Sequence, residues 1–245
     1  MSTASFDFTG QRILVTGASS GIGWAVAYHL MGAGAQVYAM GRDAQALEKL
    51  AGQGCHIVRV DMADSAALTA QLALLPPLHG LVNCAGIALL EAADAVTAEG
   101  FDQVMAVNVR AAALVAAAVA RGMITAGVAG SIVNVSSQAS LVALDDHLAY
   151  CASKAAMDAM TRVQCGEWGK HGIRVNSVNP TVTLTPMAVQ VWSKPAKRDP
   201  ALAGIPLGRF AETDEVAGPI LFLLSDAASM ISGVALPIDG GYTSR

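Results

Sequence analysis

A glycine-rich turn between a short apolar run and a helical pattern is the feature that most constrains how this chain can fold. Residues 12–15 form a β-type run, residues 16–23 contain glycines spaced G-x-x-x-G-x-G, and residues 24–33 follow a helical pattern. Glycines let a backbone approach the phosphates of a nucleotide, and the N–H groups at the start of the next helix point toward them. The turn alone is a weak signal, but in this order of elements it predicts a nucleotide-binding site.

The rest of the chain alternates between apolar runs typical of buried strands and longer helical patterns. The expected strands are residues 36–40, 56–60, 78–82, 130–136, 173–179 and 234–238, and the expected later helices are residues 97–126, 148–167 and 212–224. No internal repeat or low-complexity tract interrupts this order. We therefore predict the α/β class: one Rossmann-type domain over residues 1–245, with a doubly wound parallel sheet of about seven strands and helices on both faces.

The composition narrows the possible partners. The formal net charge is −4 and charged residues make up 14%, so the chain lacks the basic surface of a nucleic-acid-binding protein. The most apolar helical run, residues 104–120, is interrupted by Asn108 and Arg110, which argues against a membrane partner. Hydrophobic residues reach 53%, enough for a large core and a weak indication that the chain also buries surface against copies of itself.

The cysteines and the N-terminal residues predict the compartment. Residues 1–12 have no basic stretch followed by an apolar one, so we expect no signal peptide. The cysteines are scattered, and no histidine stands near them at metal-ligand spacing; they are Cys55, Cys84, Cys151 and Cys165. Reduced thiols in a cytoplasmic protein, and no metal site, are the expectation.

Tyr150 and Lys154 are the candidate catalytic pair. They stand four residues apart in a predicted helix, so the phenol and the ammonium emerge on one face, where the ammonium favours the phenolate and lowers the pKa of the phenol. Such a tyrosine can pass a proton to or from a substrate oxygen, and the hydroxyl of Ser137, at the end of a predicted buried strand, could bond the same oxygen. The alternative is an ordinary pair on a solvated helix face.

Asn108 stands among apolar residues in the predicted helix 97–126. A polar side chain on such a face needs hydrogen-bond partners. It is either a satisfied core amide or part of a helix distortion that holds a water near Lys154.

The ends of the next predicted strands carry the candidate cofactor contacts. The strand at residues 36–40 is followed by Gly41, Arg42 and Asp43, and a guanidinium there suits the 2′-phosphate of NADP. The alternative is that Arg42 is a solvated surface residue and that Asp43 caps the next helix. Asp61, after the third strand, either accepts a hydrogen bond from the adenine or caps the helix that starts near Asp64.

Residues 181–210 are a candidate substrate lid. This segment, late in the chain, contains several prolines, Trp192 and a basic cluster. A charge cluster is more often a solvated loop, so no ligand is assigned to it.

The chain resembles the short-chain dehydrogenase/reductase family over essentially its whole length. The motifs that carry the resemblance are the turn at residues 16–23, Asn83-Cys84-Ala85-Gly86, Asn108, Ser137, Tyr150-x-x-x-Lys154 and Asn179-Pro180. Within the family, the chain is most similar to the reductases of L-xylulose and dicarbonyls, over residues 131–138, 147–154, 179–182, 205–212 and 220–226. Thr181 fits that branch, because most of the family has glycine there and the L-xylulose reductases also have threonine.

The resemblance implies roles for the matched positions. Tyr150 would be the general acid in reduction, and Lys154 would lower its pKa and contact the nicotinamide ribose. Ser137 would orient the carbonyl, and Asn108 would continue the proton relay. The substrate pocket would be lined by Ser137, Gln138, Leu144, His147, Tyr150 and Trp192. The residues expected to hold the cofactor are Gly17, Ser19, Ser20, Gly21, Ile22, Gly23, Arg42, Asp61, Met62, Asn83, Ala85, Gly86, Tyr150, Lys154, Pro180, Thr183 and Thr185.

Two positions depart from that branch. Its members usually carry a basic residue where this chain has Ser20, so Arg42 must hold the 2′-phosphate alone or the preference for NADP is relaxed. Cys84 replaces the usual asparagine, which we expect to matter little.

These observations predict an NADP-dependent oxidoreductase, with NAD also possible, acting on a small ketose, polyol or vicinal dicarbonyl. The alternatives are an NAD-dependent polyol or secondary-alcohol dehydrogenase, a 3-oxoacyl thioester reductase, and a nucleotide-binding redox sensor without turnover. By resemblance the protein is a homotetramer built from its last helices and strand.

Overall fold

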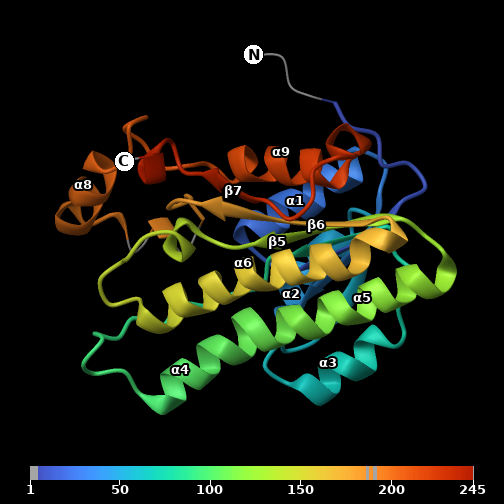
Figure 1. Ribbon diagram of the computed structural model, residues 1–245, viewed down its shortest axis with the longest axis horizontal. Coiled ribbons are helices and arrows are strands. Elements are labelled where there is room, and N and C mark those ends of the chain that lie inside the picture. Colours follow the sequence, from blue (N-terminus) through green and yellow to red (C-terminus); the bar gives the residue numbers. More distant parts are fainter. Residues whose placement is uncertain (1–4, 186–187, 190–191, 245) are drawn as a thin grey trace.

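A single sheet of seven parallel strands forms the centre of the molecule (Figure 1). The computed structural model describes residues 5–185, 188–189 and 192–244. The strands are β1 Arg12–Thr16, β2 Gln36–Gly41, β3 His56–Arg59, β4 Gly80–Asn83, β5 Gly130–Val135, β6 Ile173–Pro180 and β7 Ala235–Ile238. Their order in the sheet is β3-β2-β1-β4-β5-β6-β7, so the α/β doubly wound class predicted above is confirmed.

Helices cover both faces of this sheet. They are α1 Gly21–Gly32, α2 Ala44–Ala51, α3 Ser65–Leu72, α4 Ala98–Met105, α5 Ala112–Ala126, α6 Leu148–Trp168, α8 Pro195–Ala203 and α9 Thr213–Leu224, with a π-helical segment over Ala106–Ala111. Short 3-10 turns over Gln138–Ser140, Gly169–His171, Asp226–Ala228 and Tyr242–Ser244 complete the described elements. In Figure 1, α1 and α9 lie above the sheet and α3, α5 and α6 below it.

Two apolar cores hold these layers together. On one face, Val26 and Leu30 of α1 and Ile220 of α9 pack with fully buried strand residues. On the other, Leu68 of α3 and Val115 of α5 do the same. Parallel strands covered on both faces favour apolar residues, which are nearly continuous in β1 and β4. Strand β6 departs from this pattern with the buried polar residues Asn176, Ser177 and Asn179.

The helical stretch Ala98–Ala126 is a core element. By length and apolar composition it could cross a membrane, but 56% of its most apolar window is buried inside the protein. Asn108 and Val115 within it are fully buried. Burial of this kind is what a central helix of a globular α/β fold requires.

The topology places a binding edge where the strand order changes direction. The chain forms β1, β2 and β3 in succession toward one side of the sheet and then crosses to β4 on the other side of β1. The loops after β1 and β4 therefore leave the same edge in opposite directions. At that edge Thr16 pairs in register with Asn83, and its Oγ1 accepts hydrogen bonds from the N–H groups of Cys84 and Ala85, at 3.0 and 3.1 Å. Ligands of open α/β sheets bind in this crevice.

Candidate active site

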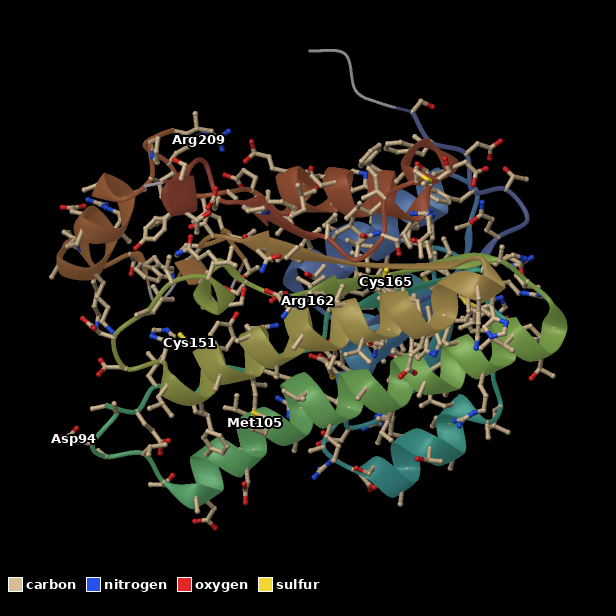
Figure 2. The ribbon with its side chains drawn as sticks, viewed as in Figure 1. Asp94, Met105, Cys151, Arg162, Cys165 and Arg209 are labelled. Carbon is tan, nitrogen blue, oxygen red and sulfur yellow. The ribbon has the colours of Figure 1, made fainter. Side chains whose placement is uncertain are left out.

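Tyr150 and Lys154 lie one turn apart on the N-terminal half of α6. Cys151, the residue after Tyr150, marks this part of the helix in Figure 2. Lys154 is 4% exposed, its Nζ lies 5.6 Å from the centre of the Tyr150 ring, and it donates a hydrogen bond to the carbonyl oxygen of Val135 at 2.8 Å. The pair therefore faces the end of β5 rather than open solvent, unlike an ordinary surface pair.

Ser137 stands at the end of β5, facing the same helix. It is 8% exposed, and its Oγ accepts a hydrogen bond from the N–H of Ala139 at 3.1 Å. Its side chain is near enough to the Tyr150 phenol to lower the pKa of that phenol. A hydroxyl and a phenol placed in this way can both reach one substrate oxygen.

Burial dominates the protonation of this pair. It raises the pKa of the Tyr150 phenol above its ordinary value, while the hydrogen bond from Ser137 lowers it in part. The net shift of the phenol pKa is therefore upward, and any lowering by Lys154 does not outweigh burial. The Lys154 ammonium has its own pKa lowered to about 8 by burial and donates to the Val135 carbonyl. A buried phenol that keeps its proton is suited to act as an acid.

Asn108 is both a satisfied core amide and part of a helix distortion. It lies in the π-helical segment Ala106–Ala111, so the expected helix distortion is present. Its side-chain amide is also fully satisfied: Oδ1 accepts from the N–H of Ile87 at 2.8 Å, and Nδ2 donates to the Ile87 carbonyl and to Ser153 Oγ at 2.9 and 3.0 Å. A π-helical turn is wider than an α-helical one and shifts the register of the main-chain hydrogen bonds by one residue. Such turns are frequent at functional sites.

The glycine turn at residues 16–23 leaves no room for side chains on its glycines, and we call this turn the glycine cradle. Gly17 and Gly21 have φ angles of +67° and +55°, and a Cβ on them would lie 2.8 Å from Ala85 and from Thr185 Cγ2, respectively. A Cβ on Gly23 would collide with the carbonyl oxygen of Gly17. Only glycine permits this close approach of β1, β4 and the lid.

The start of α1 leaves donors for an anion. Ser20 is the N-cap residue, and its side chain makes no capping hydrogen bond in the described part of the chain. The first N–H groups of a helix lack intrahelical acceptors, so they are available to a phosphate. With the glycine cradle, this arrangement fits the pyrophosphate of a dinucleotide, which Gly17, Gly21 and the first turn of α1 would hold.

The edge beyond β2 fits the outer part of such a cofactor. Arg42 is exposed at the end of β2, whereas Asp43 is the N-cap of α2 and accepts from the N–H of Ala46 at 3.1 Å. Asp64, not Asp61, caps α3; one oxygen of Asp61 accepts from the N–H of Ala63 at 2.9 Å. The capping alternative therefore holds for Asp43 and not for Asp61.

Asn83 is directed away from the cradle. It is 2% exposed, and its Nδ2 donates to the carbonyl of Ala112 at 3.2 Å and to Oδ1 of Asn134 at 3.0 Å. Asn134 in turn donates to Thr161 Oγ1 at 2.9 Å. The Asn83 side chain thus joins β4, β5, α5 and α6 in the interior.

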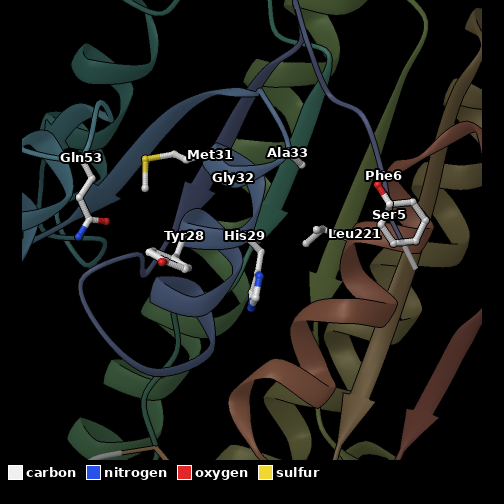
Figure 3. A pocket seen from close by; sticks show the side chains of 9 residues that line it. All are labelled: Ser5, Phe6, Tyr28, His29, Met31, Gly32, Ala33, Gln53 and Leu221. Carbon is white, nitrogen blue, oxygen red and sulfur yellow. The ribbon is translucent and has the colours of Figure 1, made fainter. Parts of the chain in front are cut away.

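A pocket elsewhere in the molecule carries none of these residues. It lies beside the last turn of α1, between the N-terminal segment and α9 (Figure 3). The lining residues are Ser5, Phe6, Tyr28, His29, Met31, Gly32, Ala33, Gln53 and Leu221. In it His29 lies 3.0 Å from Asp214. This pocket has no tyrosine–lysine pair and is not the candidate site.

Comparison with protein-family models agrees with this geometry. A model described as enoyl-(acyl carrier protein) reductase matches residues 17–243. A structure described as a short-chain dehydrogenase/reductase family protein is 37% identical, with a TM-score of 0.90 over 97% of this chain and 99% of that one. The chain belongs to the short-chain dehydrogenase/reductase family. It is thus an oxidoreductase that uses a nicotinamide cofactor.

Named relatives within the short-chain dehydrogenase/reductase family act on small sugars and polyols. An L-xylulose reductase of Caenorhabditis elegans is 47% identical over 99% of both chains, and a D-erythrulose reductase of Gallus gallus is 47% identical over 96% of both. A D-threitol dehydrogenase of Mycolicibacterium smegmatis is 42% identical over 99% of this chain and 97% of its own. The resemblance to L-xylulose reductases predicted from the motifs is confirmed.

A solved member of the family shows the cofactor class. A candidate 2-deoxy-D-gluconate 3-dehydrogenase from Agrobacterium tumefaciens, crystallised with bound NADP, is 30% identical, with a TM-score of 0.91 over 99% of this chain and 100% of that one. The glycine cradle and the uncapped start of α1 in the present chain fit a cofactor of this kind.

Of the predicted substrate-side residues, Gln138 and His147 lie beside Ser137 and Tyr150. Gln138 begins the 3-10 turn after Ser137, and His147 is the N-cap residue of α6, with its ring centre 6.1 Å from that of Tyr150. The Leu144 carbonyl accepts from the N–H of His147 at 3.3 Å. Trp192 packs edge-on against Phe210, with ring centres 5.6 Å apart.

The first part of the predicted lid returns to the cradle. Thr183 forms an isolated parallel bridge with Ala211, and Thr185 lies against Gly21. Residues 186–187 and 190–191 of the lid lie outside the described residues, and α8 occupies much of the remainder. Thr185 therefore lies beside the glycine turn.

Several supporting residues were absent from the sequence-based site. Ser153 accepts from Asn108 and donates to the Tyr150 carbonyl at 2.7 Å, linking the π segment to α6. Thr16 ties β1 to β4, and Asn179, quoted only as part of a motif, donates to the Ser137 carbonyl at 3.2 Å. The signal that could have found them is a polar residue inside an otherwise apolar strand or helix face.

Proposed function

We propose that this chain is an NADP-dependent oxidoreductase that interconverts a small hydroxylated ketone of the L-xylulose kind and its polyol, and also reduces vicinal dicarbonyls. The observation that carries the substrate class is Gln138, which follows Ser137 and is 5% exposed. Its Oε1 is buried with no hydrogen-bond partner among the described residues. A buried acceptor left in this way costs free energy unless a ligand hydroxyl satisfies it.

His147 supports the same class of substrate. Its Nδ1 lies 2.5 Å from the carbonyl oxygen of Asp145. A carbonyl can only accept a hydrogen bond, so Nδ1 carries a proton and Nε2 is the ring nitrogen left for a ligand. This nitrogen and the Gln138 acceptor favour a substrate with hydroxyl groups beside the reacting carbonyl over a 3-oxoacyl thioester, which has none there.

The reaction then follows from the protonation described above. A bound nicotinamide would supply the hydride to the carbonyl carbon in reduction and take it up in oxidation. In reduction, Tyr150 donates its phenolic proton to the carbonyl oxygen, and the Ser137 hydroxyl hydrogen-bonds the same oxygen and orients it. Lys154, as an ammonium, stabilises the phenolate that remains. Residues Ile87, Asn108 and Ser153 fix the helix that carries the tyrosine.

The preference for NADP rests on the edge after β2. Arg42 is exposed there, and the Asp43 carboxylate beside it is engaged at the start of α2. A guanidinium with no competing free carboxylate suits a 2′-phosphate. The Agrobacterium relative with bound NADP supports the same assignment.

An NAD-dependent polyol dehydrogenase is the second candidate. Ser20 stands in the glycine turn where the similar reductases usually have a basic residue, which weakens the case for a strict 2′-phosphate site. The D-threitol dehydrogenase among the relatives also favours oxidation of a polyol.

The deciding experiment follows cofactor absorbance with NADPH and, separately, with NADH. The substrates are L-xylulose, erythrulose, diacetyl and an acetoacetyl thioester. Faster oxidation of NADPH with the ketoses supports the proposal. Faster turnover with NADH favours the second candidate, and a preference for the thioester contradicts the assigned substrate class.

We also infer a cytoplasmic homotetramer. All four cysteines are free, which is usual for a reducing compartment. In the last third of the chain Leu207, Met230 and Val234 are 69%, 96% and 38% exposed, and exposed apolar side chains of this kind favour burial in a subunit interface. Light scattering of the purified protein tests this: a monomeric mass contradicts it.

A further inference from the structure

Asp158 is a buried carboxylate that the roles assigned so far do not use. It lies on α6 four residues after Lys154 and eight after Tyr150, so the three side chains follow one face of the helix. Asp158 is only 5% exposed. A carboxylate is rarely buried to this extent unless its oxygens are paired.

Both oxygens of this carboxylate are held by β6. Oδ1 accepts a hydrogen bond from Ser177 Oγ at 2.9 Å, and Oδ2 accepts from Asn179 Nδ2 at 2.8 Å. Ser177 and Asn179 are fully buried. Asp158 therefore joins the catalytic helix to the neighbouring strand at fixed points.

The network continues from Asn179 to the main chain of Ser137. Asn179 Nδ2 also lies 2.7 Å from Ser140 Oγ and 3.2 Å from the carbonyl oxygen of Ser137. Ser140 Oγ donates to that carbonyl at 2.8 Å. Displacing Asp158 would thus loosen the segment that presents the Ser137 hydroxyl.

Asp158 also influences the protonation of Lys154, in addition to its structural contacts. The ionisable groups that face Lys154 are Tyr150 and Asp158 on α6 and Cys84 after β4. Burial lowers the pKa of Lys154 to about 8, while Cys84 and Asp158 raise it. Burial raises the pKa of the Cys84 thiol to about 11, so at neutral pH this thiol is protonated and carries no charge. Tyr150 is faced in turn by Ser137, Cys84 and Cys151.

We propose that Asp158 is a positioning residue of the reaction: its carboxylate keeps Lys154 an ammonium and, through Asn179, holds Ser137 in place. This role rests on the proposed function, because it requires Lys154 to act as a cation beside Tyr150. A buried lysine with a lowered pKa needs a nearby negative charge to remain charged in the working pH range.

The test is the variant Asp158→Asn, with Ser177→Ala as the matched control. An asparagine can accept from Asn179 through its oxygen and donate to Ser177 through its amide, so it removes the charge and keeps both contacts. Ser177→Ala removes a contact to the same carboxylate and keeps the charge. The alkaline limb of the kcat profile for ketone reduction should move to lower pH by about one unit in Asp158→Asn and stay in place in Ser177→Ala.

A second measurement does not depend on turnover. Urea unfolding across pH reports the range over which Lys154 releases its proton in the folded state. That range should also begin at lower pH in Asp158→Asn. If the wild type turns over none of the carbonyls, the proposed function fails, and the unfolding profiles still test Asp158.

Three results would overturn the role of Asp158. One is an unmoved alkaline limb in a folded Asp158→Asn that still turns over, and another is an equal shift in the Ser177→Ala control. The third is loss of the folded state in both Asp158→Asn and Asp158→Ser, which would make the carboxylate a requirement for folding alone.

Discussion

At the scale of single residues, burial rather than charge pairing sets the chemistry of Tyr150 and Lys154. The phenol is pushed toward its neutral, proton-bearing form and the lysine toward its neutral amine. The first effect prepares an acid for carbonyl reduction near neutral pH. It also implies that oxidation of the alcohol, which needs the phenolate as a base, speeds up as pH rises.

Removing the Tyr150 hydroxyl should stop the reaction without disturbing the cofactor site. Tyr150→Phe is expected to lower kcat by about 10³-fold or more, because no other group takes over the proton. The binding of NADPH, followed by its fluorescence, should stay close to wild type. Retained turnover in this variant would contradict the assigned acid.

Lys154 should make stability depend on pH. Its pKa falls from 10.5 in an exposed lysine to about 8 in the folded chain. Between these values the unfolded state binds more protons, so stability increases with pH across this range, by about 3 kcal/mol in total.

Lys154→Met removes the buried ammonium and should abolish that increase. At pH 7 this variant should be more stable than wild type by about 2 kcal/mol, after allowing for the lost hydrogen bond to Val135. Urea unfolding at pH 7 and pH 10 measures both quantities. Parallel pH slopes in the two proteins would refute the assignment. Such a gain on losing an active-site residue is the usual sign that the residue is kept for function.

At the scale of elements, α9 is anchored at its C-terminal end by Arg174 of β6. Its guanidinium donates to the carbonyl oxygens of Leu223, Leu224 and Ser225, at 2.7, 3.2 and 3.0 Å. These carbonyls lack intrahelical partners, and a cation also suits the negative end of the helix dipole.

Arg174→Met should therefore destabilise the protein by about 2 kcal/mol, since it removes three hydrogen bonds and leaves the Leu224 carbonyl without this donor. The Leu223 and Ser225 carbonyls keep hydrogen bonds from Ser131 Oγ and from the N–H of Ala228. Arg162→Met, at an exposed position of α6 shown in Figure 2, is the matched control and should change stability by less than about 0.5 kcal/mol. Thermal unfolding of the three proteins measures the difference. Equal losses in both variants would exclude anchoring as the cause.

The elements themselves could be predicted well from the sequence. The six expected strands after the glycine turn match β2 to β7 within a few residues at either end, because buried parallel strands are short, continuous apolar runs. The helix expected over 97–126 was placed correctly, but its π segment could only be suspected from Asn108. Hydrogen-bond register within a helix leaves no clear trace in hydrophobic periodicity.

At the scale of the whole molecule, the order of motifs along the chain identified the family and the two ends of the site. The inward direction of Asn83 and the network from Asp158 to Ser137 could not be predicted in the same way. Both depend on how closely α6 packs against β5 and β6. Polar pairs formed by such packing join residues that are distant in sequence, and one sequence does not reveal which partners meet.

The bridge between Thr183 and Ala211 has a consequence for how this molecule acquires new substrates. Beside it, the N–H of Leu184 bonds the Ala211 carbonyl at 2.8 Å, and the N–H of Ala211 bonds the Val182 carbonyl at 3.0 Å. Main-chain hydrogen bonds thus join the two ends of the segment from 184 to 210, which we call the cassette. Changes of sequence between its two ends need not alter the pairing of Thr183 with Ala211.

Exchanging this cassette for that of the D-threitol dehydrogenase should transfer the preference among polyols and leave the pH profile of the acid unchanged. Rates on a polyol panel, measured across pH, would show it, and a profile that moved with the cassette would refute it. The substrate preference of the enzyme can then change during evolution while its catalytic residues stay the same.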